Sequence, residues 1–150
     1  MSVSELDGIG DRLLVVFDGH CGFCNRTVRW FLRRDRKDRL RFVASDSPKV
    51  SALLALYGMG APDSESGPNT VVVVRDPGGA KERVFTRSDA AMEMLRELPQ
   101  PWRVSGVVLG WIPRRVRDFG YRLVARWRYP IWGRLESCPL PTAQERAHFL

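Results

Sequence analysis

Residues Leu13–Cys24 read LLVVFDGHCGFC, and residues Asn25–Leu32 continue as NRTVRWFL. The apolar, β-branched run at 13–17 predicts a short buried strand, and the Asp-Gly pair after it predicts a turn. A helical pattern begins at the cysteines, because apolar residues, Cys24 and Val28 among them, recur on one helix face. We therefore expect a strand, a tight turn and a helix that starts at a C-x-x-C motif.

The two cysteines of this motif are expected to differ in exposure. Cys24 belongs to the apolar face of a helix predicted over 22–36, whereas Cys21 falls in its first, exposed turn. A helix N-terminus offers backbone N–H groups without partners and the positive end of the helix dipole, and both favour a thiolate. The pattern thus predicts one accessible thiol with a second sheltered behind it, which is the arrangement of a dithiol redox site.

The composition indicates a globular protein rather than a disulfide scaffold. The chain has 150 residues, of which 44% are hydrophobic and three are cysteines, too few for a secreted disulfide framework. Its first residues lack the pattern of a signal peptide, and no apolar run approaches the ~18 residues of a membrane span. We therefore expect a cytoplasmic location, where a C-x-x-C motif indicates redox or metal chemistry.

The net charge of +7 arises mainly from the C-terminal third. Residues 1–100 contain 15 basic against 14 acidic residues, whereas residues 101–150 contain nine against three. This division predicts a flexible leader at 1–12, a compact core over 13–100 and a helical extension over 101–150. We expect the extension to pack on the core, so that the chain forms one domain overall.

The remaining pattern completes a β-α-β-α-β-β-α order. It predicts a strand at 40–44, a helix opened by Ser47-Pro48, a strand at 71–74, a hairpin partner at 82–85 and a helix capped by Ser88. Four consecutive valines are too uniformly apolar for a sheet edge, so their strand should be central. A C-x-x-C motif between the first strand and helix of such a pattern predicts an α/β, thioredoxin-like core.

The residues around the cysteines resemble the DCC family of predicted thiol-disulfide oxidoreductases, named for a D-x-x-C-x-x-C signature that here runs from Asp18 to Cys24. The resemblance covers roughly residues 13–149 and implies a thioredoxin-like fold and thiol–disulfide exchange, without a particular substrate. Its further motifs are Arg33-Arg34-Asp35, Leu40–Val43, Arg87–Ala90, Tyr121-Arg122, Arg126-x-Arg128-Tyr129, Gly133 and Cys138-Pro139-x-Pro141.

Thiol–disulfide exchange gives each cysteine a role. Cys21 is the expected nucleophile, which forms a mixed disulfide with the substrate, and Cys24 is placed to resolve it. Asp18 either accepts a proton from Cys24 or serves as a turn residue. The expected substrate is a protein or small thiol that bears a disulfide, and a dithiol system or glutathione must recycle the site. No bound cofactor is required, because the dithiol itself carries the electrons.

Three further residues are candidates for supporting the site. Gly19 would supply backbone freedom for the turn. His20 could stabilise the Cys21 thiolate when protonated, or could be an exposed loop residue. Thioredoxin-like proteins place a cis-proline before the central strand, and Pro68 lies there. Because Asn69-Thr70 separate it from the valines, we expect a plain loop proline.

A zinc-binding module is one alternative function. It would use Cys21 and Cys24 together with Cys138 and with His20 or His148. A tetrahedral zinc site usually shows a second paired-ligand motif, and the sequence has none. Cys138 is otherwise a third redox thiol or a small buried residue.

A basic interaction surface is the other alternative. Residues 102–134 interleave aromatic residues with arginines, a pattern that could bind nucleic acid or an anionic membrane surface. Pro113 and Pro130 break this stretch into short pieces. We therefore expect its aromatic residues to pack on the core with the arginines solvated, and we expect no nucleic-acid partner.

Overall fold

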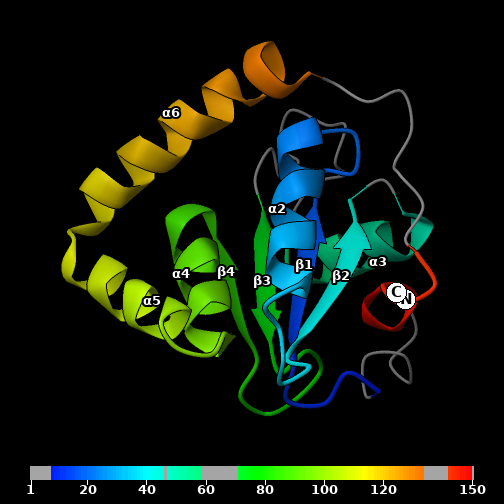
Figure 1. The fold of residues 1–150 in the computed structure, drawn as a ribbon. Coiled ribbons are helices and arrows are strands. Elements are labelled where there is room, and N and C mark those ends of the chain that lie inside the picture. The colour runs from blue at the N-terminus through cyan, green and yellow to red at the C-terminus, as the bar shows by residue number, and fades with distance from the viewer. Residues whose placement is uncertain (1–7, 46, 59–70, 134–141, 150) are drawn as a thin grey trace.

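The structure is a computed structural model, and it describes residues 8–45, 47–58, 71–133 and 142–149 (Figure 1). Its elements follow the predicted order β-α-β-α-β-β-α, and two long helices and one short helix come after them. The helices are α2 (Gly22–Leu32), α3 (Pro48–Leu56), α4 (Arg87–Glu97), α5 (Trp102–Trp111), α6 (Arg114–Trp132) and the 3₁₀ helix η1 (Arg146–His148).

Within the described residues, the sheet has four strands in the order β2-β1-β3-β4. β1 (Leu13–Phe17) runs parallel to β2 (Leu40–Ala44), as two strands joined by a helix require. β3 (Val72–Arg75) is antiparallel to β1, and β4 (Arg83–Thr86) returns beside it as a hairpin partner. The fold is the predicted mixed α/β, thioredoxin-like one, and the valine strand is an interior strand.

Strand β1 is buried on both faces and separates two apolar clusters. Because strand side chains alternate, Leu13, Val15 and Phe17 pack with α2 and α4, whereas Leu14 and Val16 pack with α3. In Figure 1, α2 lies in front of the sheet and α3 behind it. The C-x-x-C motif follows the end of β1, so the most buried strand of the sheet positions it.

The first helix is shorter than the sequence pattern predicts, because α2 ends at Leu32 rather than Arg36. Asp35 is buried, and its carboxylate accepts hydrogen bonds from the backbone N–H groups of Arg39 and Leu40, each 2.9 Å long. This carboxylate organises the turn into β2. The chain therefore leaves the helix before the periodic pattern ends.

The segment just before β1 is packed against the domain. Ile9 is buried in the cluster that contains α3, and Arg12 forms an ion pair with Asp38 at 3.2 Å. The expectation of a flexible leader is therefore wrong for residues 8–12. A single apolar residue among polar ones has no periodicity that could have indicated this burial.

The aromatic residues of the C-terminal extension are only partly packed. Trp102 meets Trp30 of α2 edge to face, with 4.8 Å between ring centroids, and thereby docks the start of α5. Trp111, Phe119 and Trp127, in contrast, are 80%, 66% and 51% exposed. The expectation that the aromatic residues of this stretch pack on the core is wrong for these three.

Polar contacts attach α6 to the core. Arg117 pairs with Asp89 of α4 at 2.9 Å, and the Tyr121 hydroxyl accepts the backbone N–H of Val71 at 3.1 Å. The side of α6 that faces the core therefore carries polar groups, whereas Phe119 and Trp127 of the same helix are largely exposed. Figure 1 shows α6 spanning the molecule above α4 and α2.

Ser88 takes part in this attachment instead of capping a helix. The N-cap residue of α4 is Thr86, and Ser88 is buried within the first turn. Its hydroxyl donates a hydrogen bond to the Asp118 carboxylate of α6, and this bond holds the pKa of that carboxyl below its ordinary value.

None of the helices in the described part of the chain has the length and apolar character of a membrane span.

Candidate active site

The C-x-x-C motif lies where β1 ends and α2 begins. Cys21 is the N-cap residue of α2, and its sulfur accepts a hydrogen bond from the backbone N–H of Cys24, with 3.2 Å between nitrogen and sulfur. Neither Cys21 nor Cys24 forms a disulfide. A backbone N–H aimed at a sulfur at a helix start stabilises negative charge there. The Cys24 N–H is therefore aimed to stabilise negative charge that develops on the Cys21 sulfur during exchange.

The exposure of the two sulfurs is the reverse of the prediction. Cys21 is fully buried, whereas Cys24 is half-buried and lines a pocket. The helical pattern places Cys21 away from the apolar face, but contacts from the rest of the chain decide whether that position is covered. Gly22, for example, donates its backbone N–H to the carbonyl of Gly133, just beyond α6, at 3.3 Å.

Side-chain hydrogen bonds hold the loop that carries the cysteines. Asp18 Oδ1 accepts the backbone N–H of His20 at 3.0 Å, which is the turn role expected as one of its two possibilities. The Asn25 amide donates to the carbonyls of Gly19 and Cys21 at 2.8 and 2.9 Å. We did not predict a role for Asn25 from the sequence. The feature that could have indicated one is an amide side chain one helical turn after the first cysteine.

The other predicted site residues have different outcomes. Gly19 is buried, and it is not among the described glycines with positive φ, so the turn does not use the conformational freedom predicted for it. His20 is half-buried rather than exposed. Pro68 and Cys138 lie outside the residues that the structure describes.

His148 lies at the opposite end of the sheet from the C-x-x-C motif. Its Nδ1 is 3.4 Å from a carboxylate oxygen of Asp38 and 3.5 Å from the carbonyl of Leu40, the first residue of β2. The cysteines follow the last residue of β1, which is parallel to β2, and five-residue strands separate these ends by ~13 Å. His148 is therefore not placed to complete a zinc site with the cysteines.

Asp38 beside His148 is already paired with arginine. Arg41 donates to its two carboxylate oxygens at 2.6 and 3.0 Å, and this hydrogen bonding lowers the pKa of Asp38 to about 2. The carboxylate is therefore charged at neutral pH and neutralised by side chains of the protein.

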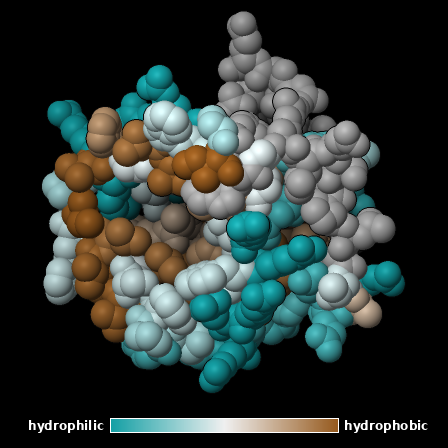
Figure 2. Space-filling view, turned by 45° about the horizontal axis from the view of Figure 1, so that its top comes forward, coloured by the Kyte–Doolittle hydropathy of each residue, from teal (hydrophilic) through white to brown (hydrophobic). Residues whose placement is uncertain are grey.

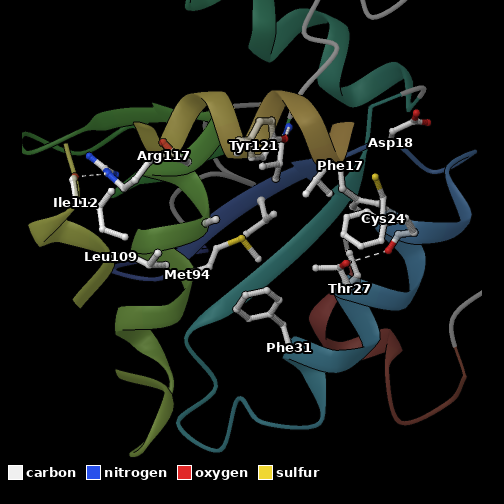
Figure 3. Close-up of a pocket in the computed structure, with 18 of the residues that line it drawn as sticks. Phe17, Asp18, Cys24, Thr27, Phe31, Met94, Leu109, Ile112, Arg117 and Tyr121 are labelled. Carbon is white, nitrogen blue, oxygen red and sulfur yellow. Dashed lines mark hydrogen bonds between the residues drawn. The ribbon is translucent and has the colours of Figure 1, made fainter. Parts of the chain in front are cut away.

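A pocket of about 450 Å³ opens beside Cys24 (Figure 2). It lies between α2, α4 and α6, and Figure 2 shows it as a hollow bordered by apolar surface. In Figure 3, Cys24 and Arg117 lie at opposite ends of the pocket, with Phe31 and Met94 between them. The carboxylate of Asp18 points away from Cys24 in the same view. The arrangement offers a thiol at one end of an apolar cavity.

Comparisons with known proteins place these features in a wider group. A family model described as DCC1-like thiol-disulfide oxidoreductase matches residues 15–134. The chain is 32% identical to the uncharacterized protein YuxK of Bacillus subtilis over 142 residues, which are 95% of this chain and 96% of that protein. It is 34% identical over 129 residues to the DCC family protein At1g52590, chloroplastic, of Arabidopsis thaliana, with 86% and 70% of the chains covered. No solved structure matches the chain.

Proposed function

Because the chain belongs to the DCC1-like thiol-disulfide oxidoreductase family, we propose that it reduces disulfides by exchange with the Cys21–Cys24 dithiol. The hydrogen bond from the Cys24 N–H to the Cys21 sulfur carries the proposal. This donor stabilises the negative charge that a cysteine sulfur carries when it attacks a disulfide.

In this proposal Cys21 attacks first and Cys24 resolves. The Cys21 thiolate attacks one sulfur of the substrate, forms a mixed disulfide and releases the other sulfur as a thiolate. Cys24 then loses its proton and attacks the Cys21 sulfur, so that the second substrate thiol leaves and the Cys21–Cys24 disulfide closes. Since Cys21 is fully buried, its attack requires a local opening that brings its sulfur into contact with the substrate.

The substrate of this reaction is a protein or small molecule that bears a disulfide. The oxidised pair must be reduced again by a dithiol reductase or by glutathione. The proposal keeps the cytoplasmic location expected from the cysteine content, because thiols stay reduced there.

Insulin reduction tests the proposal. With dithiothreitol as the recycling reductant, the protein should precipitate insulin chains faster than dithiothreitol alone, because an enzyme thiolate at a helix start exchanges faster than a free thiol. The double variant Cys21→Ser/Cys24→Ser should return the rate to background. Its circular dichroism and unfolding midpoint serve as the control for folding.

Other outcomes of this test favour the alternatives. Stoichiometric zinc in the purified protein without exchange activity would support the zinc module. Salt-sensitive binding to a DNA duplex or to anionic vesicles without exchange activity would support the basic interaction surface of residues 102–134.

Two substitutions at Asp18 separate its turn role from proton transfer. An asparagine oxygen can still accept the His20 N–H, so Asp18→Asn should keep the insulin-reduction rate within about twofold of wild type. Asp18→Ala removes the acceptor and should lower the free energy of unfolding by about 1 kcal/mol and slow exchange. A large rate loss in Asp18→Asn at unchanged stability would assign Asp18 to proton transfer from Cys24.

A further inference from the structure

The pocket beside Cys24 has apolar walls and few groups for a polar ligand. Phe31 of α2 and Met94 of α4 form part of these walls (Figure 3). Two hydroxyl groups at the pocket already bond within the protein. Ser88 donates to the carboxylate of Asp118, and Thr27 donates to a backbone carbonyl of its own helix at 2.9 Å. The walls therefore suit an apolar group.

The charged end of the pocket is also neutralised within the protein. Arg117 pairs with the Asp89 carboxylate at 2.9 Å, and its Nε donates to the carbonyl of Ile112 at 3.1 Å. The carboxylate offsets the charge of the guanidinium. A strongly anionic ligand therefore gains little from this end of the pocket.

Gly120 lines the pocket from the middle of α6, where no backbone requirement accounts for a glycine. Its φ is not positive, and a Cβ built there meets no heavy atom within 4 Å. A glycine inside a helix costs about 1 kcal/mol relative to alanine. Gly120 is exposed, and the missing side chain leaves open space at the rim of the pocket, where Val116 and Val124, one turn before and after it, also line the cavity.

From these observations we propose that the pocket binds the apolar, ring-sized substituent of the disulfide that the Cys21–Cys24 pair reduces. The inference rests on the proposed function, because it names the class of substrate for that exchange. A volume of about 450 Å³ lies in the range of ligand pockets and accommodates a substituted ring. The reacting sulfur lies at the C-x-x-C end, since Cys24 borders the cavity there.

The chemistry balances for a substrate R–S–S–R′ whose R group occupies the pocket. The Cys21 thiolate attacks the sulfur that bears R, the S–S bond breaks, and R′S⁻ leaves and takes a proton from solvent. The Cys24 thiolate then attacks the Cys21 sulfur, the bond between that sulfur and the sulfur that bears R breaks, and RS⁻ leaves and takes a proton from solvent. The dithiol loses one electron pair and two protons, and the substrate gains them as two thiols.

Graded substitutions at Gly120 test this substrate class. The reduced full-length protein is mixed with dithiodipyridine, a neutral disulfide that carries a ring on each sulfur, and separately with hydroxyethyl disulfide, which carries none. Gly120→Leu should lower the rate constant with dithiodipyridine by about tenfold or more, because its side chain fills the cavity. Gly120→Ala should change that rate little, and Gly120→Leu should lower the rate constant with hydroxyethyl disulfide much less than that with dithiodipyridine.

Arg115→Leu is the matched control for added apolar bulk. Arg115 is exposed on α6 and is not among the residues that line the pocket, so this variant should behave as wild type with both disulfides. Neither leucine is expected to weaken the helix, because leucine is a good helix former. Comparing each variant with wild type on one disulfide also cancels the different intrinsic reactivities of the two reagents.

The outcomes separate this inference from the proposed function. A wild-type protein that reacts with neither disulfide faster than a free thiol overturns the proposed function, and the inference with it. A reactive wild type whose Gly120→Leu variant slows equally with both disulfides, or with neither, overturns the inference alone. A loss much larger with dithiodipyridine than with hydroxyethyl disulfide supports it.

A ring next to the reacting sulfur can belong to a small disulfide or to a peptide. Disulfide-linked Gly-Cys-Phe and Gly-Cys-Gly peptides distinguish these sources. If Gly120→Leu slows reduction of the phenylalanine peptide selectively, a protein side chain occupies the pocket. If it slows dithiodipyridine alone, the substrate is a small molecule. Either result supports the apolar substituent.

Discussion

Expressed in cells, the Cys24→Ser variant should accumulate covalent protein adducts that reductant removes, whereas Cys21→Ser should accumulate none. A serine hydroxyl cannot carry out thiol exchange, so Cys24→Ser removes only the resolving step and leaves the mixed disulfide at Cys21 in place. Non-reducing gels should show the adducts, and mass spectrometry of the released proteins would name the substrates. Turnover of insulin by either variant should fall to background.

The same experiment decides which cysteine attacks first. The hydrogen bond from the helix favours Cys21, whereas exposure favours Cys24. Cys21 accepts the helix N–H but is fully buried, whereas Cys24 faces the pocket. Adducts that form through Cys21→Ser rather than Cys24→Ser would reverse the roles, with Cys24 attacking from the pocket and Cys21 leaving as the stabilised thiolate. The double serine variant is the control, because it can form no adduct at this site.

A fragment of residues 1–100 should be aggregated or molten, in contrast to the full chain. α5 packs against α4, and side chains of α5 and α6 form part of the pocket over Phe31 and Met94. Removing them exposes this apolar surface to water, where it promotes association and loosens packing. Gel filtration, dye binding and near-ultraviolet circular dichroism of the fragment and the full chain measure the difference.

A soluble fragment that unfolds cooperatively and reduces insulin would contradict the expectation that the extension belongs to one domain with the core. The exposed side chains of the extension make this outcome informative. Trp111 and Phe119 contribute little to the core at their observed exposures. Any stabilisation of the core by the extension must therefore come from the inner faces of α5 and α6. Trp102, which packs on α2, is the contact expected to matter most at the start of the extension.

Strands and helices of the core were predictable because their signals are local. The apolar run before the motif predicted β1 at its observed bounds, and the valine run predicted an interior strand. The end of α2 was not predictable, because the buried carboxylate of Asp35 determines it by bonding residues that follow in the next loop. Periodicity describes a helix face but carries no information about such a side-chain cap.

The sequence alone determined the order of elements and the position of two cysteines at a helix start, since both depend on neighbouring residues and on steric preferences of the backbone. Only the tertiary structure decided what covers each sulfur and where the pocket opens. These depend on contacts between distant segments, such as Ser88 with Asp118 and Gly22 with Gly133. An apolar helix face has the same sequence pattern whether it is buried by a neighbouring element or exposed to water. The exposure of apolar side chains on α6 and the open space beside Gly120 are therefore visible only in the folded chain.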